Sequence, residues 1–283
     1  MAKIAWVEAC QLDPTLSSLT RFFDVPPAFA ETLAGGLTNR CWKIVAPHKG
    51  NYVWRPISEL TNAFTISRFQ EYQILKAIEH DVIGPKAVFI NEKGLLVEWI
   101  DGEQFNDAEF DLQLKTLVRI HLLDKKRIPV APFNYTARVD HYWMQLPASV
   151  QDEALKALYQ RWRSVPTLEP EELTLCHFDL GPHNLVKTAQ GLRVIDWEYA
   201  GIADPRLDLA MLLTTEDKLN PAHIARYCQL RDIDTVDAWI EGVTQWSIRV
   251  QMMALLWYLL AFHLRGDPIY EQQAIQIKEN LCK

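Results

Sequence analysis

The 283-residue sequence has no C-x-x-C pair and no repeat or low-complexity stretch, and its five cysteines are widely spaced. An odd number of scattered cysteines fits neither a disulfide framework nor a structural zinc site. No apolar run approaches the roughly 20 residues that a membrane span needs, and the N-terminus lacks the long apolar segment of a secretory signal. We therefore expect a cytoplasmic protein with reduced thiols and no membrane insertion.

Charge is unevenly distributed along the chain. The net charge is −7, and the first 100 residues carry ten basic and ten acidic side chains, so the whole negative excess falls on the remainder. An excess of negative charge disfavours nonspecific binding to nucleic acid or to anionic membranes. We expect neither as a partner, and the composition leaves the oligomeric state open.

The sequence pattern changes near residue 100. Before it, short apolar segments alternate with turn residues and are interrupted by one segment of helical periodicity, 65–79. After it, most segments have helical periodicity, except 175–197. We predict an α+β fold of two lobes: residues 1–100 form a small antiparallel-sheet lobe with one main helix, and residues 101–283 form a larger, mainly helical lobe. A ligand is expected in the cleft between two such lobes.

One stretch carries the residue types that phosphoryl transfer needs. Residues 176–186 read CHFDLGPHNLV, with the skeleton H-x-D-x-x-x-x-N, and Asp196 ends the apolar segment that follows. The reaction needs a carboxylate that orients the attacking hydroxyl and accepts its proton, and oxygen ligands that hold Mg²⁺ against the phosphates. Asp179 suits the first role, and Asn184 and Asp196 suit the second.

Together with IDWEYAG at 195–201, this stretch resembles the aminoglycoside phosphotransferase and choline kinase family, and most closely choline kinases and bacterial thiamine kinases. The resemblance implies a protein-kinase-like fold and an ATP- and Mg²⁺-dependent kinase that phosphorylates an alcohol. It also implies that His177 braces the loop and that Asp208 accepts hydrogen bonds from the loop backbone. The alternative, a helical protein with these residues as caps and turns, is disfavoured because several motifs occur in the expected order.

Nucleotide-binding residues are expected in the first lobe. A glycine turn between two expected strands lets backbone amides approach phosphates, and it resembles the glycine loop of choline kinases, although an ordinary hairpin turn is the alternative. Arg55 stands where protein kinases carry a lysine, and Glu71 on the predicted helix is its natural partner. A hinge after the predicted hairpin would contact adenine through its backbone. The predicted nucleotide-binding set is Gly35, Gly36, Thr38, Asn39, Arg55, Glu71, Glu98, Trp99 and Ile100.

The acceptor is expected to bind to the second lobe, beside Asp179. Carboxylates and aromatic faces suit a cation, so we expect a small cationic alcohol that is choline-like or thiamine-like. The helical spacing of Trp246 and Trp257 also fits core packing, which leaves that alternative open. The predicted acceptor contacts are Trp197, Glu198, Tyr199, Trp246 and Trp257.

Other functions remain open from the sequence. An aminoglycoside kinase has a polycationic acceptor that acidic residues suit equally well. A catalytically inactive, ATP-binding regulatory module is disfavoured because Asp179, Asn184 and Asp196 are retained together. A protein kinase is disfavoured because no D-F-G…A-P-E segment follows Asn184. The sequence does not distinguish ATP from GTP.

Overall fold

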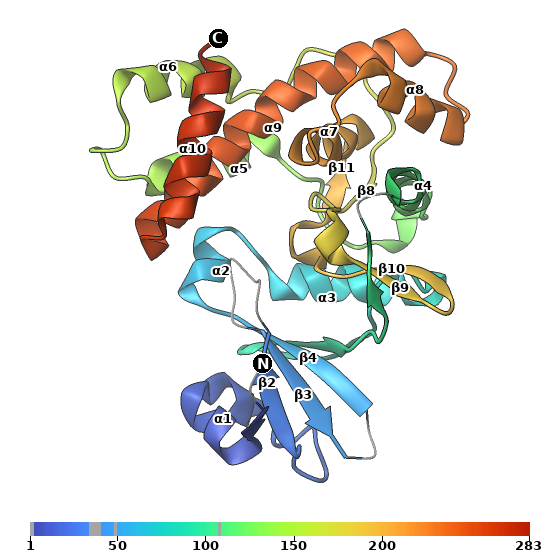
Figure 1. The fold of residues 1–283 in the computed structure, drawn as a ribbon, viewed down its shortest axis with the longest axis vertical. Helices are drawn as coiled ribbons and strands as arrows, with labels where there is room; N and C mark the ends of the chain where they lie inside the picture. The colour runs from blue at the N-terminus through green and yellow to red at the C-terminus, as the bar shows by residue number, and fades with distance from the viewer. Residues whose placement is uncertain (1–2, 34–40, 48–49, 107–108) are drawn as a thin grey trace. The chain divides into compact units, whose positions relative to one another are not determined.

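The computed structural model describes residues 3–33, 41–47, 50–106 and 109–283. They form two compact units, and the chain passes between these units more than once (Figure 1). The first, the sheet unit, comprises Met1–Asn106, Lys126–Val130 and Pro182–Tyr199; the second, the helical unit, comprises Asp107–Lys125, Ala131–Gly181 and Ala200–Lys283. The segment Pro182–Tyr199, predicted for the second lobe, therefore belongs to the same unit as the N-terminal strands.

A six-stranded antiparallel sheet with the strand order β1-β2-β3-β4-β6-β5 forms the base of the sheet unit. Its central strands pair in a regular register, with Trp42 opposite Trp54. Side chains alternate between the two faces of a strand, so alternate residues of β3 are buried. The strands are β1 (Lys3–Ala5), β2 (Phe29–Thr32), β3 (Trp42–Ala46), β4 (Gly50–Pro56), β5 (Ala87–Asn91) and β6 (Gly94–Glu98).

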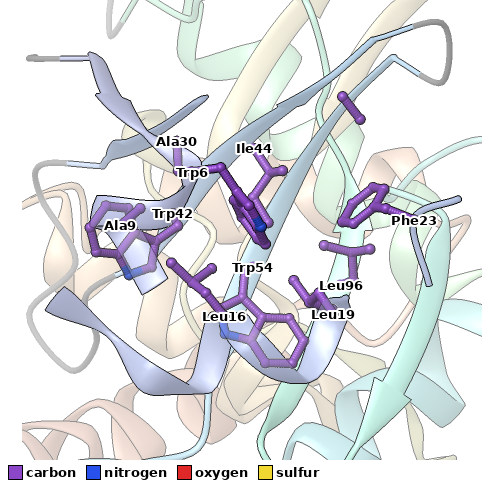
Figure 2. Packing of buried hydrophobic residues seen from close by; sticks show 11 residues of the cluster. Trp6, Ala9, Leu16, Leu19, Phe23, Ala30, Trp42, Ile44, Trp54 and Leu96 are labelled. Carbon is purple, nitrogen blue, oxygen red and sulfur yellow. The ribbon is translucent and has the colours of Figure 1, made fainter. Parts of the chain in front are cut away.

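An apolar cluster joins the N-terminal segment to this sheet (Figure 2). The helix α1 (Trp6–Leu12) and the 3₁₀ helix η1 (Pro14–Leu19) supply Trp6, Ala9, Leu16 and Leu19 to it, and the strands supply Ala30, Trp42, Ile44, Trp54 and Leu96. The two strand indoles also need polar partners because buried N–H groups are costly when unpaired. The Trp42 indole donates to Asp13 Oδ2 (2.8 Å) and the Trp54 indole donates to Thr15 Oγ1 (2.9 Å).

Two helices follow β4, and only the second lies in the segment 65–79 that is predicted to be helical. α2 (Glu59–Ala63) begins with a capping box between Ser58 and Thr61, and Thr65 has a left-handed φ of 57°. The second helix, α3 (Arg68–Ala77), begins at the cap Ser67, which accepts the N–H of Gln70. It packs against β5 and β6 and brings its buried face toward the sheet.

A three-stranded sheet of β7 (Glu103–Gln104), β9 (Leu185–Thr188) and β10 (Gly191–Val194) completes the sheet unit. β9 and β10 form a hairpin, and directly after its turn β10 begins with Gly191 at a φ of 107°, a conformation that favours glycine. The 3₁₀ helix η5 (Pro182–Asn184) precedes the hairpin and η6 (Trp197–Tyr199) follows it.

The long helix α9 organises the helical unit, where it packs against α5, α6, α7, α8 and α10 (Figure 1). Side-chain caps begin most helices of this unit; for example, Asp204 accepts the Arg206 N–H at the start of α7. The helices are α4 (Phe110–His121), α5 (Tyr135–Gln145), α6 (Glu153–Trp162), α7 (Pro205–Thr215), α8 (Pro221–Leu230), α9 (Val236–Arg265) and α10 (Pro268–Leu281). A two-stranded antiparallel pair, β8 (Thr174–Cys176) and β11 (Gly201–Ala203), completes it. The predicted α+β fold class is confirmed.

By length and composition, α9 could cross a membrane, which the apolar runs of the sequence do not predict. Its most apolar 18-residue window has a mean hydropathy of 1.3, and 44% of that window is buried inside the structure. A helix at the core of a protein without membrane spans meets the same criterion. Because α9 packs against five other helices, this finding is weak evidence for a span.

Candidate active site

The β9–β10 hairpin brings two of the predicted site residues together in the sheet unit. Asn184 ends η5 directly before β9, and Asp196 follows β10. The two strand ends are neighbours because Leu185 pairs with Val194, and the N–H of Ile195 donates to the carbonyl of Asn184 (2.9 Å). The predicted metal-binding oxygens of Asn184 and Asp196 therefore lie at the same end of one hairpin.

Asp196 has a backbone conformation that marks it as a special position. Its φ is 63°, in the left-handed region that non-glycine residues enter at a cost, although aspartate does so more readily than most residues. Its side chain keeps 31% of its surface exposed while Asn184 is buried. Such conformations cluster at functional sites, where they aim a side chain that a regular strand would turn elsewhere.

Arg55 on β4 contacts Asp196 through its guanidinium, as well as Glu71 on α3. The expected pair is present, with Nε of Arg55 2.9 Å from Oε1 of Glu71. Among the described residues this Nε–H has no acceptor in hydrogen-bonding geometry, so the contact with Glu71 is an ion pair rather than a directed hydrogen bond. Burial disfavours the charged guanidinium, but Asp196 and Glu71 outweigh it and raise the pKa of Arg55 well above its ordinary value.

Two further charged residues complete the contacts of Arg55. Glu198 on η6 places its Oε2 2.8 Å from Arg55 and 3.0 Å from Arg68, and Arg68 in turn lies 2.6 Å from Glu71. Arg68 is absent from the predicted site, although its i,i+3 spacing from Glu71 is a recognisable ion-pair signal. Glu198 is a predicted acceptor contact, but its buried carboxylate is held by two guanidinium groups. Those contacts argue against a direct role in acceptor binding.

The donors at the hairpin fit a magnesium ion. A carboxylate and a neutral amide are hard oxygen ligands of the kind that Mg²⁺ prefers. The charges of Arg55, Arg68, Glu71 and Glu198 sum to zero, so Asp196, which contacts Arg55, brings the net charge of these five residues to −1. We therefore identify Asn184 and Asp196 as the residues that could hold such an ion.

In the helical unit, Asp208 on α7 holds the start of the H-x-D segment that follows β8. Its carboxylate accepts the backbone N–H of His177 (2.7 Å) and of Phe178 (2.8 Å), which are the expected hydrogen bonds. Phe178 has a φ of 65°, an uncommon conformation for a bulky residue, and its N–H bond to Asp208 stabilises it. The ring of His177 accepts the N–H of Asp179 (3.3 Å), so this histidine braces the loop as expected.

His121, on α4, is a supporting residue that the sequence does not reveal. Its Nε2 lies 3.0 Å from Asp208 and its Nδ1 contacts the hydroxyl of Tyr227. His121, Cys176 and Asp208 form a buried group with the spacing of metal ligands. However, both ring nitrogens already have partners, and burial raises the pKa of the Cys176 thiol, which therefore stays protonated. This cluster is a support for the loop.

Tyr258 on α9 lies near Asp179 and belongs to an aromatic group that also includes a residue of α10. Burial, followed by the charge of the Asp179 carboxylate, raises the pKa of Tyr258. Tyr258 stands edge-on to Trp257 with ring centroids 5.1 Å apart, and Trp257 contacts Tyr270 in the same way at 6.0 Å. Trp257 and Tyr258 are half-buried, so part of this aromatic group is exposed.

Two other predicted acceptor contacts lie in the core. Trp197 is fully buried, and its indole donates to the carbonyl of Val194 (2.8 Å). Trp246 is buried against the ring of Tyr135 and donates to Asp204 (3.2 Å). Their burial argues against contact with an acceptor, because both indoles are used for packing. Tyr199 lies on η6 and is half-buried.

The predicted hinge begins at the end of β6, an inner strand of the sheet, where backbone hydrogen bonds hold it. The N–H of Glu98 donates to the Lys86 carbonyl (2.9 Å), and the N–H of Trp99 donates to the Asn51 carbonyl (3.0 Å). One face of the Trp99 ring carries the ammonium of Lys43, 3.8 Å from its centroid. Ile100 follows and is half-buried. The predicted glycine-loop residues lie outside the described part of the chain: Gly35, Gly36, Thr38 and Asn39.

The fold and the residues of the H-x-D-x-x-x-x-N…D pattern point to one class of protein. Comparison with known proteins shows which class it is. Residues 30–239 match the phosphotransferase enzyme family. The chain belongs to this family, which confirms the predicted membership and the predicted enzyme class, a small-molecule kinase.

Individual relatives refine the comparison. A thiamine kinase of Salmonella gallinarum is 28% identical over 204 residues, which cover 70% of this chain and 69% of that protein. Among solved structures, choline kinase LicA from Streptococcus pneumoniae has a TM-score of 0.74 at 17% identity, covering 98% of this chain and 99% of its own. Aminoglycoside 2′-phosphotransferase-IIIa, solved as a GDP complex, has a TM-score of 0.66 at 19% identity, covering 95% and 97%. These structures confirm the kinase-like fold.

Proposed function

We propose that this phosphotransferase uses ATP and Mg²⁺ to phosphorylate the hydroxyl group of a small cationic alcohol, thiamine-like or choline-like. The thiamine kinase relative supports this acceptor class, and the ATP requirement favours a cytoplasmic location. The observation that carries the proposal is the pairing of Asp196 with Arg55 beside Asn184. It gathers oxygen ligands and a fixed positive charge at the end of one hairpin.

In this mechanism Asp179 orients the acceptor hydroxyl and accepts its proton as the oxygen attacks the γ-phosphorus, while the bond to the β,γ-bridging oxygen breaks and ADP leaves. Asn184 and Asp196 hold Mg²⁺, which when bound neutralises charge on the phosphates. Arg55 contacts the phosphates with its guanidinium, and Glu71 keeps that group oriented. The glycine loop predicted at residues 35–39 is proposed to contact the phosphates through its backbone amides.

The aromatic group of the helical unit supports a cationic acceptor. Trp257 and Tyr258 present ring surface, and the charge of Asp179 acts on Tyr258. A quaternary ammonium or thiazolium group is attracted by aromatic faces, at about 0.5–2 kcal/mol per contact. An acceptor of this kind would place its positive charge on the aromatic group and its hydroxyl toward the carboxylate. Aminoglycosides, which carry several ammonium groups, are the competing acceptor class.

A substrate panel tests the proposal. Purified protein is incubated with labelled ATP, Mg²⁺ and, in parallel, thiamine, choline, ethanolamine or kanamycin, and transfer of label is measured. We expect transfer to thiamine or choline, and a loss of about 10²–10⁴-fold in Asp179→Asn with nearly unchanged ATP binding.

Three results would contradict the proposal. Preferential transfer to kanamycin would assign the acceptor to the aminoglycoside class. Binding of ATP without transfer to any alcohol would favour an inactive regulatory module. Asp179→Asn turnover within a few-fold of the parent protein would remove Asp179 from the role of base.

A further inference from the structure

Four side chains in the sheet unit form a closed ring of alternating charge. Arg55 contacts Glu71 (2.9 Å), Glu71 contacts Arg68 (2.6 Å), Arg68 contacts Glu198 (3.0 Å), and Glu198 contacts Arg55 (2.8 Å). We call these four residues the charge ring. It links β4, α3 and η6, three elements that are distant in sequence.

The charge ring is buried, and this makes its neutrality important. Its four members are between 1% and 8% exposed. A buried charge without a partner is costly, so such groups occur in compensated sets. Two guanidinium and two carboxylate groups compensate each other fully, and Asp196 attaches to this neutral set through Arg55.

Arg68 is the member that makes the compensation possible. Without it, one guanidinium, that of Arg55, would face three carboxylates: Glu71, Glu198 and Asp196. Competition among three carboxylates would draw Arg55 away from Asp196.

The two arginines use different nitrogen atoms for their contacts. Arg68 contacts both carboxylates through the single atom Nη1. Arg55 contacts Glu71 through Nε and contacts Glu198 and Asp196 through Nη2. A lysine ammonium can replace one bridging nitrogen, although its side chain is one bond shorter. It cannot replace the two separated nitrogens of a guanidinium fork.

We propose that Arg68 is a positioning residue that balances Glu71 and Glu198 in the charge ring and so keeps Arg55 directed at Asp196. Arg68 contacts no reacting group in this arrangement. Its proposed effect on the nucleotide and the metal passes through Arg55. This inference rests on the proposed function for its consequence, the binding of ATP with Mg²⁺.

Binding measurements on a set of variants test the role of Arg68. The dissociation constant of a non-hydrolysable ATP analogue is measured by calorimetry with and without magnesium chloride. We expect Arg68→Met to weaken binding with magnesium about tenfold, equivalent to a coupling of about 1.4 kcal/mol, and Arg68→Lys to stay within about threefold. Arg55→Lys should lose at least as much as Arg68→Met, because two nitrogens are needed there. Arg127→Met, which breaks an exposed pair with Asp81 in the same unit, is the matched control and should bind like the parent protein.

A charge-balanced double variant separates positioning from a loss of folding. Arg68→Met with Glu198→Gln removes one charge of each sign and leaves the net charge of the ring at zero. We expect it to fold, with a higher melting temperature than Arg68→Met, and to bind the analogue within about threefold of the parent. Binding as weak as in Arg68→Met would overturn the charge-balancing role. Binding by folded Arg68→Met within twofold of the parent would overturn it as well.

The two proposals fail in different ways. If the parent protein transfers no phosphoryl group to any alcohol, the proposed function fails while the stability comparison still tests the ring. If the parent transfers phosphoryl groups and Arg68→Met binds normally, the inference on Arg68 fails alone.

Discussion

Replacement of Asp208 with asparagine should destabilise the helical unit and disturb the H-x-D segment. Asp208 is buried and has three donors, the N–H groups of His177 (2.7 Å) and Phe178 (2.8 Å) and Nε2 of His121 (3.0 Å). Asparagine has the same shape but only one acceptor oxygen. Whichever way its amide turns, the NH₂ group faces at least one of these donors.

The free energy of unfolding falls least when the amide oxygen faces His177 and His121 and the NH₂ group faces Phe178. A hydrogen bond to a charged group contributes about 1.5–3 kcal/mol, and a buried unsatisfied N–H costs about 1–3 kcal/mol. We therefore expect Asp208→Asn to lower the free energy of unfolding by about 3 kcal/mol. The strained φ of Phe178 loses its hydrogen bond in this variant, so Asp179, the next residue, should also be displaced and turnover should fall.

Urea unfolding followed by tryptophan fluorescence, together with turnover, measures both effects. Asp111→Asn is a matched control in the same unit, since Asp111 forms an exposed pair with Arg226 and should change stability little. A loss below about 1 kcal/mol in Asp208→Asn, with parental turnover, would refute the view that this carboxylate supports the loop.

Two further predictions concern the requirement for a metal ion and the stability of the fold at acid pH. Asp196→Ala should lower turnover about 100-fold or more, with only partial recovery at high magnesium concentration; full activity of the parent without any divalent ion would contradict the magnesium role. Burial lowers the pKa of His121, so the ring is neutral in the folded state and takes up a proton on unfolding below about pH 6.5. Stability should therefore fall as the pH decreases from about 6.5 toward the folded-state pKa, and His121→Gln should reduce this slope in urea titrations between about pH 7 and 5. Identical slopes for the parent protein and His121→Gln would contradict the assignment of this pH dependence to His121.

Local sequence signals predict much of the sheet and of the loop. Strands β3 to β6, the helix α3 and the H-x-D segment follow from periodicity and turn residues that lie within a few positions of one another. The support of the loop by Asp208 and the pair of Arg55 with Glu71 follow from the family resemblance. These features depend on short-range pattern or on a known arrangement of motifs.

Long-range arrangement is what the sequence does not reveal. Arg68 and Glu198 are 130 positions apart, and nothing local indicates that the second of them is shared by two guanidinium groups. The spacing of Trp246 on its helix is compatible with both a pocket and a core, and only tertiary packing decides for the core. The membership of Pro182–Tyr199 in the sheet unit likewise depends on pairing between β7 and β9.

The apolar cluster of Figure 2 includes residues that lie outside the family match. The family match begins at residue 30 and ends at residue 239, near the start of α9. A fragment cut at these limits would expose the faces of Trp42 and Trp54 to water and deprive their indole N–H groups of Asp13 and Thr15. It would also lack most of the central helix of the other unit. We therefore expect the segments on both sides of the family match to be needed for the packing within each of the two units.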